Sequence, residues 1–309
     1  MRKIPKNETL PPPNDISKGI NMKFKVDHDY HIHTYLSSCS RNPEQNPDFL
    51  IRYARENGIK TICITDHFWD DAVAGASGWY AAQNLSHIRE ILPFPTDPEV
   101  RIMFGCETEL RRDLTLGISP DKFDTFDMIV IPTTHMHMNG CTVSEDGSES
   151  AEERAKLWVE RLDAVLNMDL PFGKVGIAHL ACFLINRKSE EDYLATIRAI
   201  PDGEMTRLFT KAAALGVGIE LNNGDLKYAL KHEAVMRMFH IAKSCGCKFY
   251  LGSDAHNPGE FNGAVLRAER VVNILGLTED DKFTPSSENV RYPSRPQTQI
   301  ENENTTARK

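Results

Sequence analysis

The regular alternation of two kinds of segment limits the folds open to this chain. Seven short runs rich in β-branched and aromatic residues are separated by stretches, most of which have the apolar spacing of amphipathic helices. Strands and helices that alternate in this way imply parallel β/α units. The predicted strands are residues 26–34, 61–67, 101–109, 127–135, 174–180, 217–223 and 247–256.

The first helical segment shows the expected signals at both ends. Asn46 is placed to cap the helix, Pro47 suits its first turn, and Gly58 ends it. Residues 204–216 and 233–246 have the same apolar spacing and also end at a glycine. We therefore expect helices between most of the predicted strands.

The two ends of the chain lack such periodicity. Both are polar and contain proline, which is typical of segments that do not join a packed core. The predicted organisation is a flexible tail over residues 1–24, one folded domain over 25–284 and a second flexible tail over 285–309.

The overall charge and the cysteine content exclude several classes of protein. A formal net charge of -8 argues against broad attraction to nucleic acids or membranes. The N-terminus has no apolar segment of signal-peptide length, and no run of 18 apolar residues occurs. Seven scattered cysteines, an odd number, fit reduced thiols better than a disulfide framework. We expect a cytoplasmic protein with no membrane partner.

Every predicted strand ends in a side chain that can bind metal or donate from an amide. In a β/α barrel these strand ends converge on one face, where barrel enzymes place their chemistry. A single histidine in a strand is more often a hydrogen-bonded core residue, but many imidazoles and carboxylates are costly to bury together without cations. The sequence therefore predicts a multinuclear metal site. The residues concerned are His31 and His33, Asp66 and His67, Glu107, His135, His179, Glu220 with Asn222 and Asn223, and Asp254 with His256.

These motifs carry a resemblance to a known family. "DYHIHT", "ITDHF", "GCETE", the strand ending at His135, "GIAHL", "IELNN" and "LGSDAH" resemble, in order, the motifs of the polymerase and histidinol phosphatase superfamily. The match spans about Asp27 to Pro258. The resemblance implies a distorted seven-stranded (β/α) TIM-like barrel, within the domain over 25–284, that acts as a metal-dependent phosphoesterase.

The resemblance also implies a set of ligands. His31, His33, Glu107 and Asp254 would hold a first metal, and Glu107, His135 and His179 a second, with Glu107 as the bridge. His67 and His256 would hold a third metal. The family's remaining ligand to that metal falls here on Cys39, or on Ser40, and a thiolate would favour zinc over manganese. The expected cofactors are two or three divalent transition metals, Zn, Mn or Fe.

The expected chemistry follows from bridged metals. They generate a hydroxide at neutral pH and clamp the attacking and leaving oxygens of a displacement at phosphorus. Glu107, Asp254 and His256 are the predicted catalytic residues. Asp66 is placed to orient a histidine, and Asp29 has either the same role or a structural one. His137 is either a proton donor or part of a loop, and Arg187 is the first choice among the arginines for binding phosphate.

The function that fits best is hydrolysis of a small phosphomonoester, as in histidinol phosphatases. The alternatives are a phosphodiesterase or exonuclease that acts on nucleotides or oligonucleotides, a regulatory metal-binding module without turnover, and a carbon-centred amidohydrolase. The acidic composition and the lack of a basic or aromatic stripe favour a small substrate over nucleic acid.

Overall fold

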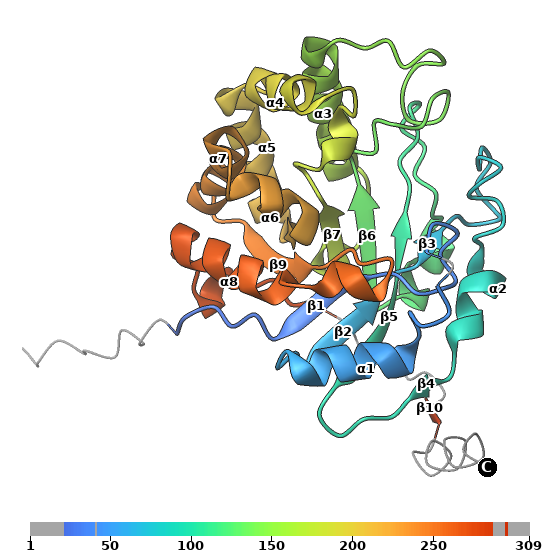
Figure 1. Cartoon of the computed structure of the whole chain (residues 1–309). Coiled ribbons are helices and arrows are strands. Elements are labelled where there is room, and N and C mark those ends of the chain that lie inside the picture. The colour runs from blue at the N-terminus through green and yellow to red at the C-terminus, as the bar shows by residue number, and fades with distance from the viewer. Residues whose placement is uncertain (1–21, 41, 287–293, 296–309) are drawn as a thin grey trace, which may run out of the picture.

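Seven parallel strands form a nearly closed barrel in the computed structural model, which describes residues 22–40, 42–286 and 294–295 (Figure 1). Neighbouring strands follow the order β1-β2-β5-β6-β7-β8-β9. The predicted distorted seven-stranded barrel is therefore confirmed. Its strands are β1 (His28–Ile32), β2 (Thr61–Ile64), β5 (Arg101–Thr108), β6 (Met128–Pro132), β7 (Val175–Ala178), β8 (Gly218–Asn222) and β9 (Lys248–Gly252).

The barrel closes between its first and last strands through a short contact. Ile32 and Ala255 form an isolated parallel bridge. The amide of His33 donates to the carbonyl of Ala255 over 3.2 Å, and the amide of Asp254 donates to the carbonyl of His31 over 2.7 Å. This closure brings the ends of the chain's first and last motifs together.

Three short strands were not predicted as separate elements. β3 (His67–Phe68) follows β2 after a two-residue break and pairs with β5, in the register His67 to Glu107. β4 (Phe94–Pro95) and β10 (Ser294–Arg295) form a small parallel pair apart from the barrel.

Helices follow most strands and pack on the outside of the barrel. The predicted first helix is observed as α1 (Pro47–Glu56), in which the Asn46 side chain accepts a hydrogen bond from the amide of Phe49. Helices α3 to α8 form a continuous layer along one side, whereas a long loop with α2 covers the side near β3 (Figure 1). The other helices are α2 (Leu85–Ile88), α3 (Ala151–Leu166), α4 (Glu190–Ala199), α5 (Asp202–Leu215), α6 (Asn223–Ala229), α7 (Glu233–Ser244) and α8 (Ala264–Leu275).

Two apolar clusters hold the fold together. The larger lies between the strands and the surrounding helices. The smaller fills the barrel with side chains from most of its strands, among them Tyr30, Met103, Val130 and Tyr250. This smaller cluster fills the interior of the barrel. The polar residues at the C-terminal ends of the strands therefore lie at one open end of the barrel.

Most of the two predicted tails, residues 1–24 and 285–309, lies outside the described residues. The parts that are not described are residues 1–21, 287–293 and 296–309. Within the assigned N-terminal tail, Phe24 is buried, and its amide donates to the carbonyl of Leu277 over 3.4 Å. None of the described helices is both long enough and apolar enough to cross a bilayer.

Candidate metal centre

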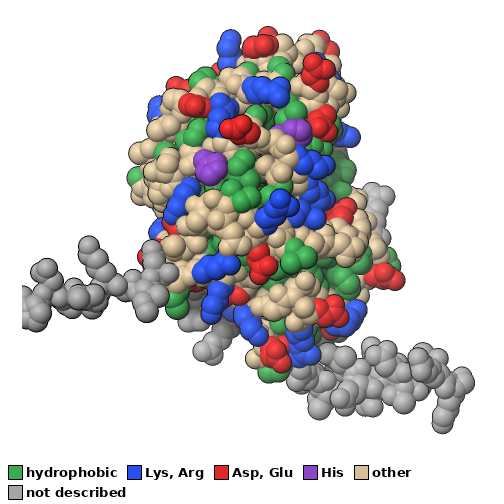
Figure 2. Space-filling model, turned by 60° about the vertical axis from the view of Figure 1, so that its left-hand side comes forward, with side chains coloured by type: hydrophobic (Ala, Val, Ile, Leu, Met, Phe, Trp, Pro, Cys, Tyr) green, Lys and Arg blue, Asp and Glu red, His purple; other side chains and the backbone are tan. Residues whose placement is uncertain are grey.

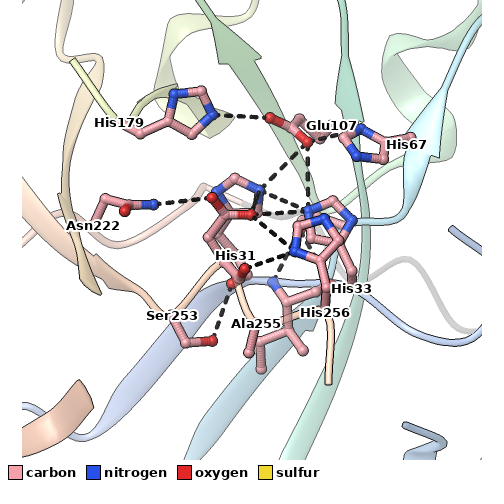
Figure 3. Close-up of polar contacts among 12 residues, drawn as sticks. His31, His33, His67, Glu107, His179, Asn222, Ser253, Ala255 and His256 are labelled. Atoms are coloured by element: carbon pink, nitrogen blue, oxygen red, sulfur yellow. Dashed lines mark hydrogen bonds and ion pairs between the residues drawn. The ribbon is translucent and has the colours of Figure 1, made fainter. Parts of the chain in front are cut away.

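The first group of expected ligands converges at the barrel closure. His31 lies on β1, His33 directly follows it, and Glu107 lies on β5 (Figure 3). Asp254 follows β9. The two Nε2 atoms lie 3.1 Å apart, and each lies 3.2–3.6 Å from Glu107 Oε2 and from Asp254 Oδ1. Tetrahedral zinc with bonds near 2.05 Å separates its ligand atoms by about 3.3 Å. His31, His33 and Glu107 therefore have the spacing of ligands to one metal, and Asp254 lies within the same range of both imidazoles.

The second group shares the same carboxylate. Glu107 Oε1 lies 3.2 Å from His179 Nε2 and 3.9 Å from His135 Nε2, while its Oε2 atom faces the first group. One carboxylate thus presents a different oxygen to each of two ligand groups. This is the arrangement of a bridging ligand.

The third group contains a histidine that the sequence assigned elsewhere. Ligand atoms of His33, His67 and His256 lie within 4.8 Å of one another. The His33 ring stacks on His256 with a centroid separation of 4.0 Å and lies 4.4 Å from His67. Cys39 opens to the adjoining pocket and contacts both outer histidines. Desolvation alone would raise the pKa of the Cys39 thiol, but hydrogen bonding with His256 and His67 lowers it to about 7.

Buried carboxylates hold two of the histidines from behind. His31 Nδ1 lies 2.7 Å from Glu220 Oε1, and the other oxygen of Glu220 accepts the amide of His179 over 2.6 Å. A neutral His31 that donates from Nδ1 directs its Nε2 lone pair into the cluster. Gly252 makes room for this carboxylate, because a Cβ there would lie 1.7 Å from Glu220 Oε1.

Glu109 has the same role behind His135. Its Oε2 atom lies 2.7 Å from His135 Nδ1 and accepts the hydroxyl of Tyr80 over 3.2 Å. The buried guanidinium of Arg161, on α3, lies 3.5 Å from the other oxygen. The Thr134 hydroxyl lies 3.0 Å from His179 Nδ1.

The two predicted supporting aspartates act through other groups. Asp66 accepts hydrogen bonds from the amide and hydroxyl of Thr34 and from Ser37, whose Oγ lies 2.9 Å from His33 Nδ1. Asp66 therefore orients His33 through a serine. The carboxylate of Asp29 instead accepts the amide of Ser253 over 2.9 Å and the hydroxyl of Tyr53 over 3.1 Å, so it secures the barrel closure rather than an imidazole.

Two candidate ligands have unfavourable backbone conformations. His179 has φ of 30° and Asp254 has φ of 53°, in the left-handed region that side chains with a Cβ rarely adopt. Such a conformation costs roughly 1–3 kcal/mol and persists where the surrounding structure enforces it. At Asp254 a hydrogen bond helps to hold the side chain in place, because Asn222 Nδ2 donates to Asp254 Oδ2 over 3.3 Å.

The protonation of the cluster reflects its crowded charges. Burial alone would lower the pKa of His31, but Glu220, Asp254 and Glu107 raise it well above its usual value. Burial and repulsion by His256 and His67 hold the pKa of His33 well below its usual value. Burial opposes ionisation of Glu107 and Asp254, yet the surrounding histidines lower both carboxyl pKa values well below their usual range. The carboxylates of Glu107 and Asp254 are therefore ionised at neutral pH.

Two buried atoms test whether this cluster fits a metal. His67 Nδ1 and Glu107 Oε2 are 2.9 Å apart, yet neither makes a hydrogen bond of acceptable geometry within the described part of the chain. Unpaired buried polar atoms are costly and rare. Their closeness without a hydrogen bond is what two ligands in adjacent metal sites would show. The imidazole and carboxylate donors suit divalent Zn, Mn or Fe.

A pocket of about 530 Å³ opens above the cluster. His137 lines it, and burial together with repulsion by His135 and Arg187 lowers the pKa of His137 to about 3. Arg187, predicted to bind phosphate, is exposed and does not line the pocket. Its positive charge nevertheless contributes to the lowered pKa of His137.

The sequence placed Glu220 among the strand-end residues of the predicted metal site, but it did not predict that Glu109 and Glu220 lie behind histidines. Both stand two residues from another candidate polar residue, Glu107 and Asn222, in an alternating strand pattern. That period-2 spacing was a usable signal, because it places them on the same face as their partners.

No protein-family model and no curated protein matches the chain. Among solved structures, it is similar to the histidinol phosphate phosphatase (HISK) of Lactococcus lactis subsp. lactis Il1403, complexed with Zn, L-histidinol and phosphate. That likeness has 15% sequence identity and a TM-score of 0.50, and it covers 84% of this chain and 99% of the other.

A second likeness is to the metal-dependent tyrosine phosphatases YwqE of Bacillus subtilis and CpsB of Streptococcus pneumoniae. It has 14% identity over 85% of this chain and 97% of the other, with a TM-score of 0.38 that is too low to establish a shared fold. The chain thus shares its fold with a histidinol phosphate phosphatase, as the resemblance to the polymerase and histidinol phosphatase superfamily predicts.

Proposed function

We propose that this chain is a metal-dependent phosphoesterase that hydrolyses a small phosphomonoester at the open face of its barrel. One observation carries the proposal. Glu107 directs one oxygen to His31 and His33 and the other to His135 and His179. A carboxylate that serves two ligand groups is typical of multinuclear sites that activate phosphate esters.

The proposed ligands form three sets. His31, His33, Glu107 and Asp254 would hold one ion, Glu107, His135 and His179 a second, and His67 and His256 a third, with Cys39 completing that set. Divalent Zn, Mn or Fe bound there would supply Lewis-acid activation of a phosphoryl oxygen and of water.

The chain's own residues position these groups. Glu220 and Glu109 each lie 2.7 Å from Nδ1 of His31 and His135, and neutral rings that donate from Nδ1 to these carboxylates would direct their Nε2 lone pairs at a cation. Glu107, Asp254 and His256 line the pocket and are the residues we place at the reacting phosphate. His137, neutral at pH 7, would hydrogen-bond to the substrate.

Several features support a small substrate over nucleic acid. The pocket has the volume of a small-molecule site, and none of the described residues that line it is Lys or Arg. On the face shown in Figure 2, Lys and Arg are interspersed with Asp and Glu rather than gathered in a basic stripe. A phosphatase of the same fold binds zinc, L-histidinol and phosphate. All seven cysteines are free thiols, which fits our proposal of a cytoplasmic location.

The test is metal analysis together with enzyme assays. Protein purified without chelator should contain two or three equivalents of transition metal by elemental analysis. After chelation and reconstitution with Zn, Mn or Fe, it should hydrolyse phosphomonoesters faster than phosphodiesters or short oligonucleotides. Less than one equivalent of metal, with no activity gained on reconstitution, would reject the proposal. A preference for oligonucleotides would favour the exonuclease alternative.

A further inference from the structure

The wall of the pocket above the metal centre is apolar. Trp79, Tyr80, Met138 and Leu184 line the space next to the cluster. Trp79 is 38% exposed although it is a large aromatic residue. It packs edge-on against His67 and Tyr80, with ring centroids 4.9 and 4.7 Å away. An exposed indole beside a ligand cluster indicates a surface that a bound molecule covers.

The loop that carries Trp79 is held in place from several sides. The amide of Trp69 donates to the carbonyl of Gln83 over 2.9 Å. The side chain of Gln83 in turn donates from Nε2 to the carbonyl of Trp79 over 3.2 Å. Arg111 donates to the carbonyl of Gly75, at the start of the same loop. The apolar wall is therefore formed before a ligand binds, which reduces the entropy lost on binding.

Charged groups other than the proposed ligands are absent from the described residues that line this pocket. Its acids are Glu107 and Asp254, both in the cluster, and no Lys or Arg is among its lining residues. A charged amine on the substrate would find no carboxylate outside the cluster, and a second anionic group would find no cation.

Outside the proposed ligand set, the uncharged polar side chains of Ser77, Asn139 and His137 also line the pocket, and His137 offers the substrate a buried atom. His137 Nδ1 is buried and has no hydrogen-bond partner in the described part of the chain. Its ring lies edge-on to His135 at a centroid distance of 5.3 Å, so it stands at the boundary between the cluster and the apolar wall.

From these features we infer that the substrate's organic group is uncharged and apolar, and that an aromatic ring covers Trp79 while the phosphate faces the cluster. This inference rests on the proposed function and narrows its substrate class. It separates esters of neutral apolar alcohols from esters of amino alcohols.

Two primary alkyl phosphates test the inference because both leave as simple alcohols. The metal-reconstituted enzyme should hydrolyse 2-phenylethyl phosphate with a kcat/KM about 10- to 100-fold above that for 2-aminoethyl phosphate, the range expected for burial of one phenyl group. Trp79→Ala should reduce this ratio about tenfold, and Trp79→Phe should largely retain it. Leu266→Ala, a matched change at an apolar residue on α8 that is 71% exposed, should leave both rates unchanged.

A gain of function completes the design. Leu184→Glu adds a carboxylate to the pocket wall and should raise kcat/KM for 2-aminoethyl phosphate while lowering it for the phenyl ester. Equal rates on the two esters, or a preference for the amine, in an active wild-type enzyme would overturn the inference alone. Hydrolysis of neither ester with any of the three metals would reject the proposed function itself. Thermal melting of each variant separates loss of folding from loss of specificity.

Discussion

Glu220 Oε1 lies 2.7 Å from Nδ1 of His31, on the side of the ring that faces away from the ligand cluster. Both side chains are fully buried, and the same carboxylate accepts the amide of His179 through its other oxygen. Glu220 thus contacts two proposed ligands that come from different strands. Its negative charge also raises the basicity of His31 towards a metal.

Glu220→Gln is expected to weaken metal binding by about 10- to 100-fold without unfolding the protein. The amide keeps the shape but loses the charge, and its NH2 group must face either the His31 ring or the amide of His179. Competition with a chromophoric chelator measures the affinity. Glu191→Gln, at an exposed residue of α4, is the control and should bind metal like the wild type. Equal affinity in the two variants would contradict the role of Glu220.

Glu107→Gln should lower both metal content and turnover more than any cysteine substitution does. A neutral amide cannot offer an anionic oxygen to both ligand groups, and its NH2 end cannot bind a cation. Elemental analysis and the phosphatase rate should fall together. Cys245→Ser, distant from the cluster, serves as the comparison. Native metal content in the Gln variant would transfer the bridging role to another residue, with Glu109 the first to examine.

Cys39→Ser should reduce metal stoichiometry towards two and lower activity, while the sites built on Glu107 stay occupied. A serine hydroxyl is a harder and weaker ligand than a thiolate, so the loss should be greatest with zinc. His67→Ala, measured beside it, removes the same proposed site from its opposite side. If stoichiometry falls in His67→Ala but not in Cys39→Ser, the third metal binds without this sulfur.

Metal binding should release protons and weaken as the pH falls. Burial lowers the pKa of His67 and His256, but Glu107 and Cys39 raise that of His67 to about 10, and Cys39 and Asp254 raise that of His256 to about 9. Below pH 9 both rings carry protons that a metal must displace. Burial also lowers the pKa of His31 and His179, but the carboxylates around His31 and the groups around His179 raise the pKa of those two rings well above the usual value. Calorimetry in two buffers of different protonation enthalpy should therefore give a release of more than two protons near pH 7. A metal affinity that is constant between pH 6 and 9 would contradict this.

Asp225 should make the metal-free protein less stable as the pH rises. Burial raises its pKa from 3.8 to about 8, and Oδ1 has no hydrogen-bond partner among the described residues. The folded state therefore binds more protons than the unfolded state between about pH 4 and 8, so the free energy of unfolding falls as the pH rises through that window. Urea unfolding of Asp225→Asn should show a slope about 1.4 kcal/mol per pH unit shallower. Asp280→Asn, at an exposed position, should keep the wild-type slope.

Local patterns in the sequence were sufficient to predict the barrel. Each predicted strand contains an observed barrel strand, and the Asn46 cap and Pro47 begin α1 as expected. These features depend on neighbours along the chain. The pairing of β4 with β10 depends instead on segments about 200 residues apart. Each of these strands has only two residues, which is too short to show a periodic pattern in the sequence.

Depth and loop course explain what could not be predicted in the site. Glu107 and Glu109 look alike in an alternating pattern, yet one faces the cluster and the other lies behind His135. The sequence gives no measure of that depth. Nor does it specify that the loop after β3 brings Trp79 to the pocket while Arg187 stays outside. Loop paths follow from many weak contacts rather than from one periodic pattern.

The narrow closure of the barrel between Ile32 and Ala255 bears on when the proposed metal sites would be completed. His31 and His33 are made early in synthesis, whereas Asp254 and His256 follow more than 200 residues later. A nascent chain that ends before residue 254 lacks Asp254, which belongs to the first proposed set of ligands, and His256, which belongs to the third. The first and third proposed sets would therefore be completed late, and ions bound there would join the first strand to the last and oppose reopening of the barrel at this seam.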